Sequence, residues 1–225
     1  MICHVRHLGT VDYGKCYQSM VDFSLSALDV TPDELWCLEH PPVYTVGLNG
    51  NSEHLLNVGD IPVVQTDRGG QVTYHGPGQL VVYCLLNMHS KGYGVRELVQ
   101  RLEKAMIEQL ADYGVEATQK TGAPGVYVEG RKIAALGIRV KRGRAWHGIA
   151  LNVDMDLSPF KGINPCGYRG LEITQLNDIV PGKSVPEVAS DLAPRLVSCL
   201  ELEQPILAGE AVPENRHLAQ LNIND

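Results

Sequence analysis

The sequence has no hydrophobic run long enough to cross a membrane. Its longest apolar stretch runs from Leu80 to Leu86, whereas a membrane helix needs roughly 20 such residues. The first residues, Met-Ile-Cys-His-Val-Arg-His, lack the charged and then apolar layout of a signal peptide. We therefore expect a cytoplasmic protein with no membrane partner.

The sequence also has no paired cysteines. Its six cysteines are scattered, and none forms a Cys-x-x-Cys pair (Cys3, Cys16, Cys37, Cys84, Cys166 and Cys199). A disulfide framework or a structural zinc site is therefore not expected in a chain of this size and compartment. We expect no metal.

Positive charge is scarce overall but is concentrated in one window. The net charge of −7 argues against nucleic acid as a partner. The window from Arg131 to Arg169 nevertheless carries +6, which leaves −13 for the rest of the chain. Two interpretations stay open: a basic face that docks an acidic partner, or an ordinary solvated hairpin rich in arginine.

The hydrophobic pattern predicts an α+β fold with a mostly antiparallel sheet. The 225 residues suit one large domain, or one domain with a small appendage. We expect strands near 2–8, 34–39, 62–66, 80–87, 125–129, 131–140 and 145–153, and helices over 12–28 and 95–112. Strands and helices do not alternate regularly, so a doubly wound fold is not expected.

The C-terminal part predicts a third helix and then a tail. Ser184-Val-Pro-Glu187 fits a capping box, and Pro194 is expected to kink or end the helix that follows. From about Glu203 the chain mixes proline, glycine and polar residues. We expect a single domain over 1–203 and a weakly ordered tail over 204–225.

A glycine-rich segment stands out between Arg68 and Tyr83. Four glycines (Gly69, Gly70, Gly76 and Gly78) surround Thr73, Tyr74 and His75. Glycine lets the backbone approach a ligand closely and adopt positive φ. The segment is either an elaborate turn or a loop that cradles substrate. It is not a P-loop, because the glycine spacing and the Lys-Ser/Thr pair are absent.

A lysine occupies an unusual place in the segment Glu129 to Val140. Glu129-Gly130 predicts a tight hairpin turn. Alternation in the strand after it places Lys132 on one apolar face (with Ala134, Leu136, Ile138 and Val140). A lysine there must pair with another group, extend its ammonium to solvent or lose its proton, because burial lowers its pKa. The catalytic interpretation is a desolvated lysine that exchanges a proton near neutral pH.

One cysteine differs from the others in its setting. Cys37 and Cys84 lie within apolar segments typical of inert core thiols. Cys166 stands in the loop Asn-Pro-Cys-Gly-Tyr-Arg, beside Arg169. Loops on a rigid scaffold often carry reactive groups. A nearby ammonium would favour the thiolate, which is the reactive form of cysteine.

Together these segments resemble the lipoyl(octanoyl) transferase family. Arg68-Gly-Gly-x-x-Thr-Tyr-His-x-x-Gly-Gln-x-Val-x-Tyr83 matches the family signature at each fixed position. Further matches are Glu39–Gly47, Gly122–Tyr127, Gly130–Ala134, His147-Gly148 and Asn164–Gly167. The resemblance extends over about residues 10 to 200.

The resemblance implies a fold, an activity and a set of residues. The fold would be that of biotin and lipoate protein ligases, a curved sheet flanked by helices. The reaction would move octanoyl from acyl carrier protein to a lysine of a lipoyl domain, with Cys166 as the thioester nucleophile and Lys132 as its activator. The acceptors would be E2 subunits of 2-oxoacid dehydrogenases and the glycine cleavage H protein. Substrate contacts would fall on Arg68, Gly69, Gly70, Gln71, Val72, Thr73, Tyr74, His75, Ala135, Leu136, Gly137, Gly148, Ile149 and Ala150.

The implied chemistry needs neither nucleotide nor cofactor, because a thioester is already activated. His75 is expected to orient substrate or backbone and not to act as a second base. Leu136, Tyr74 and Tyr83 are candidate walls of an acyl tunnel, and the family suggests a monomer. Alternatives are an ATP-dependent lipoate or biotin ligase, an acyl thioesterase and a non-enzymatic module that binds acyl carriers.

Overall fold

A computed structural model describes residues 2–27, 30–209 and 211–213. In these residues an eight-stranded mixed sheet forms the centre, with strand order β11-β1-β2-β6-β10-β9-β8-β7. β1 pairs in parallel with β11 and β2, and the remaining neighbours are antiparallel. The strands are β1 (Ile2–Thr10), β2 (Asp33–Glu39), β6 (Gln79–Asn87), β7 (Thr118–Gln119), β8 (Val126–Val128), β9 (Arg131–Lys141), β10 (Arg144–Asn152) and β11 (Glu203–Leu207).

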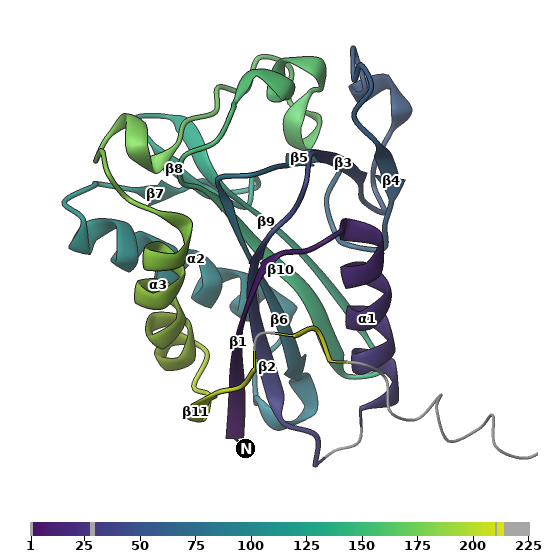
Figure 1. The fold of residues 1–225 in the computed structure, drawn as a ribbon, viewed down its shortest axis with the longest axis vertical. Coiled ribbons are helices and arrows are strands. Elements are labelled where there is room, and N and C mark those ends of the chain that lie inside the picture. The colour runs from purple at the N-terminus through teal and green to yellow at the C-terminus, as the bar shows by residue number, and fades with distance from the viewer. Residues whose placement is uncertain (1, 28–29, 210, 214–225) are drawn as a thin grey trace, which may run out of the picture.

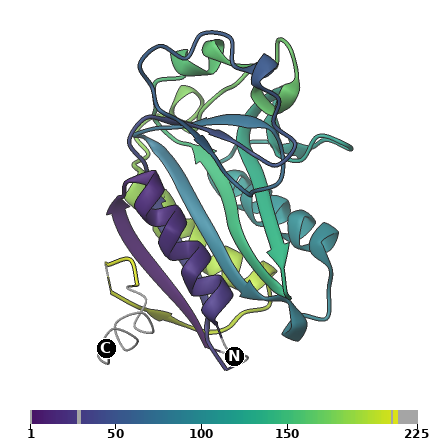
Figure 2. The same cartoon turned by 90° about the vertical axis from the view of Figure 1, so that its right-hand side faces the viewer.

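Helices cover both faces of this sheet, as Figures 1 and 2 show. α1 (Tyr13–Ser26) lies on one face, whereas α2 (Val95–Asp112) and α3 (Val185–Cys199) lie side by side on the other. The central strand β6 is buried along its whole length. Its even-numbered apolar residues pack toward α2 and α3, and Val81, Tyr83 and Leu85 pack toward α1. This two-sided burial explains the apolar run from Leu80 to Leu86.

A second, three-stranded sheet stands at one end of the large sheet (Figure 1). It consists of β3 (Val43–Val46), β4 (Val63–Gln65) and β5 (Val72–His75), in the order β4-β3-β5. The glycine-rich segment therefore contains a strand, which the sequence did not predict. Tyr44, Tyr74 and Phe160 belong to a separate small core beneath this sheet.

The elements near the C-terminus differ from the prediction in two respects. Ser184 caps α3 through its side chain, as expected. However, α3 continues through Pro194 to Cys199, so of the two expected outcomes, a kink or an end, the end is wrong. Residues 204–207 of the predicted tail belong to β11, which pairs with β1, while residues 214–225 lie outside the described part of the chain.

Candidate active site

Cys166 lies in a tight turn over Pro165–Gly167, between the two sheets. Its backbone adopts the left-handed region, with φ 55° and ψ 19°. Non-glycine residues rarely adopt this conformation, and it recurs where a structure holds a reactive group in place. The turn is fixed by bonds from Gly167 N to Asn164 O (3.0 Å) and from Asn164 N to His54 O (2.9 Å).

Lys132 reaches Cys166 from β9. Its Nζ donates to Cys166 Sγ over 3.1 Å and to Pro124 O over 3.0 Å. The ammonium also lies 5.2 Å from the centre of the Tyr127 ring. The Lys132 side chain is buried, and Cys166 is partly exposed. The two groups are therefore within the hydrogen-bond reach that general acid–base chemistry needs.

A β-bulge in β9 turns the side chain of Lys132 toward Cys166. Tyr127 of β8 pairs with Lys132, but the preceding residue Val126 pairs with Ala134, so Ile133 is an extra residue in β9. Lys132 shares the face of Tyr127. Ile133 and Ala134 both pack into the main core.

Because of the bulge, Lys132 does not lie on the face of β9 that the sequence predicted, which it was expected to share with Leu136, Ile138 and Val140. Leu136, Ile138 and Val140 pack against the main core under α2 and α3. Strict alternation would place Lys132 with them. The extra residue reverses the alternation, so Lys132 instead faces the side of Cys166.

Of the outcomes expected for Lys132, its contacts support pairing with another group. Burial on its own lowers the pKa of Lys132, but the neighbouring Cys166 raises it, and the net pKa lies above the ordinary lysine value. Lys132 is therefore an ammonium in the resting state, not a desolvated amine. An ammonium at 3.1 Å can stabilise a thiolate on Cys166 through a charge-assisted hydrogen bond.

The other cysteines lack such a partner. Burial raises the pKa of Cys3, Cys16 and Cys37 to about 12, which keeps them as inert thiols. Burial likewise raises the pKa of Cys84 and Cys199. Within the described part of the chain, only Cys166 receives a hydrogen bond from a cationic side chain.

A narrow cavity, here called the acyl slot, extends from Cys166 over the large sheet. Its floor consists of small residues on neighbouring strands, because Gly137 pairs with Gly148 and Ala135 with Ala150. The slot is lined by Tyr13, Arg68, Gly70, Gln71, Val72, Thr73, His75, Val81, Tyr83, Ala135, Leu136, Gly137, His147, Gly148, Ile149, Ala150 and Cys166. Most of the predicted substrate residues therefore meet around Cys166.

Two predicted contact residues lie elsewhere. The Tyr74 ring packs between Tyr44 and Phe160 in the small core, with centroid distances of 5.4 and 5.5 Å. Tyr74 is therefore not a wall of the slot. Gly69 lies beside the slot, where its N donates to Ile138 O over 3.1 Å. A Cβ at Gly137 would approach Gly69 O to 2.9 Å, so the loop can cross β9 only where glycine stands.

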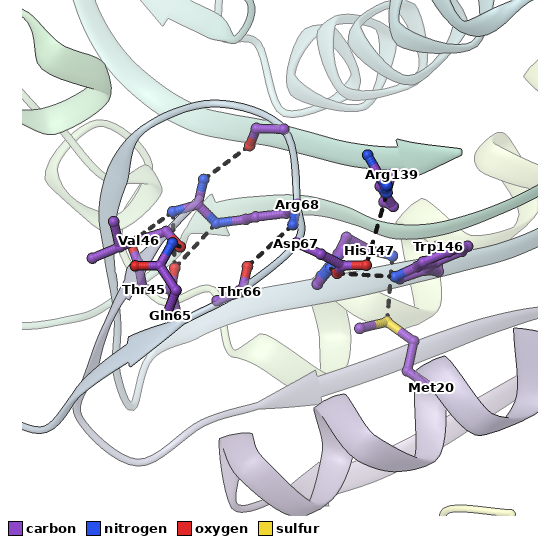
Figure 3. A network of polar contacts seen from close by, with 11 residues as sticks. Met20, Thr45, Val46, Gln65, Thr66, Asp67, Arg68, Arg139, Trp146 and His147 are labelled. Carbon is purple, nitrogen blue, oxygen red and sulfur yellow. Dashed lines mark hydrogen bonds and ion pairs between the residues drawn. The ribbon is translucent and has the colours of Figure 1, made fainter. Parts of the chain in front are cut away.

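The glycine-rich loop is anchored in two opposite directions (Figure 3). The Arg68 guanidinium donates to Thr45 O (2.7 Å), Gln71 O (2.6 Å) and Gly69 O (2.9 Å), and to Thr45 Oγ1. Asp67 turns the other way and accepts hydrogen bonds from His147 Nε2 (2.8 Å) and Trp146 Nε1 (3.2 Å). Arg68 thus holds the loop to β3, and Asp67 holds it to β10.

His75 is a neutral, fixed side chain. Burial lowers its pKa to about 3, and its Nδ1 lies 2.7 Å from Gln79 Oε1. Because that oxygen only accepts, His75 donates from Nδ1. Gln79 in turn donates to Asn152 Oδ1 over 2.9 Å. This supports the expectation that His75 positions its surroundings and is no second base.

The positive window does not form one basic face. Lys132 and Arg144 are buried. Arg131 lies beside the carboxylate of Glu129, and Arg139 lies beside that of Asp67. The remaining basic residues of the window are exposed: Lys141, Arg142, Lys161 and Arg169. Of the exposed residues, Lys141 and Arg142 lie at the tip of the β9–β10 hairpin. That tip is roughly 30 Å along β9 from Lys132, since a strand rises about 3.4 Å per residue. The interpretation as a single docking face is therefore wrong.

The described residues also bear on metal binding and on membrane insertion. No three His, Cys, Asp or Glu side chains there gather so that they could hold a metal ion. No helix in that part of the chain is long and apolar enough to span a bilayer.

Comparison with known proteins identifies the family. A sequence model of the lipoyl protein ligase A/B catalytic domain matches residues 19–196. The chain belongs to this family. It is 54% identical to an octanoyltransferase of Laribacter hongkongensis, over 89% of this chain and 97% of that protein. It is 55% identical to an octanoyltransferase of Stutzerimonas stutzeri, over 91% of this chain and 94% of that protein.

Solved structures share the fold at low sequence identity. A crystal structure of lipoate-protein ligase A bound with ATP superposes with a TM-score of 0.80 at 15% identity, covering 98% of this chain and 94% of that one. A biotin protein ligase from Aquifex aeolicus gives a TM-score of 0.56 at 15% identity, covering 89% and 70%. The predicted biotin and lipoate ligase-like α+β fold is confirmed.

Several residues of the site were not predicted from the sequence. Tyr13, Val81 and His147 line the slot, and Asp67 anchors the loop. Asp67 directly precedes the family signature, and His147 stands in one of the matched motifs. Tyr13 comes from a distant helix, so no local pattern indicated it.

Proposed function

We propose that this chain transfers octanoyl from acyl carrier protein to a lysine of a lipoyl domain, through a thioester on Cys166. The hydrogen bond from Lys132 Nζ to Cys166 Sγ, at the slot that Cys166 lines, is the observation that carries the proposal. The octanoyltransferase relatives support the acyl group and the reaction class. The likeness to ligases supports only the fold.

The first half-reaction loads the enzyme. The Cys166 thiolate attacks the carbonyl carbon of the octanoyl thioester and forms a tetrahedral oxyanion. The bond to the pantetheine sulfur then breaks, leaving octanoyl on Cys166. The Lys132 ammonium gives its proton to the departing thiolate, so a neutral amine and a neutral thioester remain in the site.

The second half-reaction uses the amine that the first one leaves. The neutral acceptor lysine attacks the Cys166 thioester, and an amide forms as the bond to Cys166 Sγ breaks. Lys132 takes the proton that the new amide nitrogen loses. This restores the pair of ammonium and thiolate, so each cycle balances without a nucleotide or a cofactor.

The partners follow from the same reaction. The acceptors would be lipoyl domains of 2-oxoacid dehydrogenase E2 subunits and the glycine cleavage H protein, and the donor would be octanoyl-acyl carrier protein. The enzyme would act in the cytoplasm as a monomer. Size-exclusion chromatography with light scattering tests the last point.

A transfer assay tests the proposed function. Octanoyl carrier protein and a lipoyl domain are mixed with enzyme in the absence of nucleotide, and the products are weighed by mass spectrometry. We expect octanoylated lipoyl domain with wild type and with Cys199→Ser, a matched change at another partly exposed cysteine. Cys166→Ser should be inactive. A need for ATP would indicate a ligase, and free octanoate in place of the modified domain would indicate a thioesterase.

A further inference from the structure

A second cavity, here called the outer groove, meets the acyl slot at Cys166. It encloses about 340 Å³, against about 50 Å³ for the slot. Both cavities are lined by Gly70, Gln71, Leu136, Gly137 and Cys166, and the groove also reaches Lys132. The two chains joined by a thioester at Cys166 can therefore extend into different cavities, one into the narrow slot and the other into the wide groove.

The groove follows an edge of β9 that no strand covers. Among the described residues, β8 pairs with β9 only as far as Ala134. Beyond it Ile138 O accepts from Gly69 N, so Ile138 points its peptide groups away from β10. Peptide groups alternate in direction along an antiparallel strand. Leu136 therefore also presents its N–H and C=O to the groove.

A buried amide oxygen adds a second polar anchor. Gln71 Oε1 is shielded from solvent and has no hydrogen-bond partner among the described residues. Buried acceptors are costly when unpaired, so a donor group is expected there. Gln71 lines both cavities, beside the turn that carries Cys166.

The opposite wall of the groove is apolar. Val95 and Val99 of α2 and Pro124 face it, and Tyr168 stands at the opening. Val95 and Tyr168 are 45% and 48% exposed, so this wall presents apolar atoms to an occupant of the groove. An occupant must therefore combine hydrogen-bonding amide groups on one side with apolar atoms on the other.

We infer that the outer groove binds the pantetheine arm of the donor carrier, with its amides along the free edge of β9 and at Gln71. The arm is an extended chain with two amides and a pair of methyl groups, so its chemistry fits both walls. Its amides would pair with Leu136 as an added strand does in β-augmentation. The octanoyl chain would enter the slot while the arm stays in the groove.

This inference rests on the proposed function, and donors of different length test it. Octanoyl-pantetheine carries the arm without a carrier protein, and S-ethyl octanethioate has the same thioester without an arm. The rate constant for loading Cys166 is measured with each donor by quenched-flow mass spectrometry. For wild type we expect octanoyl-pantetheine to react at least about tenfold faster at limiting concentration.

Substitutions that fill the groove should strongly reduce this preference. Val99→Trp and Val95→Trp place an indole in the groove, and Gln100→Trp places one on an exposed position of α2 that does not line it. The Val99 and Val95 variants should lose at least about fivefold with octanoyl-pantetheine and keep the wild-type rate with S-ethyl octanethioate. Gln100→Trp should resemble wild type with both donors.

The two possible failures are distinguishable. If wild type shows no preference for octanoyl-pantetheine, or if both groove variants keep the wild-type preference, the groove does not bind the arm. The short donor reports in each variant whether the site is still folded. If no donor loads Cys166 in wild type, the proposed function itself is wrong.

Discussion

Arg68 should be a structural clamp on the glycine-rich loop, and its replacement by methionine would test this directly. The guanidinium serves three backbone carbonyls, Thr45 O, Gly69 O and Gln71 O, as well as Thr45 Oγ1. Methionine has a similar length but donates no hydrogen bond. The carbonyls would stay buried without this donor.

The magnitude follows from the number of lost bonds. Net contributions of hydrogen bonds from charged groups are about 1.5–3 kcal/mol, and part is offset because the buried guanidinium no longer needs desolvation. We expect Arg68→Met to lower the free energy of unfolding by about 3–4 kcal/mol. For a domain of this size the melting temperature would fall by roughly 10 °C.

Differential scanning calorimetry measures this change, with Arg131→Met as the control. Arg131 also carries a full charge, but it lies near the surface and pairs with exposed Glu129. Its loss should cost at most about 1 kcal/mol. If Arg68→Met melts within about 2 °C of wild type yet loses activity, Arg68 acts on substrate and the clamp reasoning is refuted.

Three further predictions follow from the same contacts. Lys132→Met should slow loading of Cys166 by roughly 10²–10⁴-fold in quenched flow, and a change under threefold would remove Lys132 from the mechanism. The pKa of Lys132 is raised, so its stabilising effect is present at neutral pH and lost as pH rises through that pKa. The gap between the urea midpoints of wild type and Lys132→Met should therefore stay constant up to about pH 10 and close only at higher pH, and a gap that already closes near pH 8 would contradict the raised pKa. Ser184→Ala should cost about 1 kcal/mol by removing the α3 cap, with transfer activity intact.

The local patterns of the chain predicted most helices and strands. The helix expected over 95–112 coincides with α2, because its buried residues repeat at helical spacing and face the sheet. β3 and β5 were missed although both lie within matched motifs, because each has only four residues and is flanked by proline or glycine, which is typical of loops. Pro194 did not end α3, because it is exposed and the carbonyl that loses its helical partner lies on the solvent side.

The sequence predicted which residues form the site more reliably than it predicted how their side chains are oriented. Cys166 and Lys132 stand out as a loop cysteine and a strand lysine, and the structure brings them to 3.1 Å. The direction of Lys132 depends on the bulge at Ile133, which the sequence pattern does not reveal. The positive window was misjudged because burial is not visible in the sequence: Arg144 is buried, whereas Lys141 and Arg142 are exposed at the hairpin tip.

The central claim is that octanoyl resides on Cys166 between donor and acceptor. Enzyme is mixed with octanoyl carrier protein and no acceptor, and intact and peptide mass spectrometry locate the added group. We predict an octanoyl adduct on Cys166 that disappears when lipoyl domain is added and reappears on the lysine of that domain. Modification of the lipoyl domain without any adduct at Cys166 would contradict the covalent route.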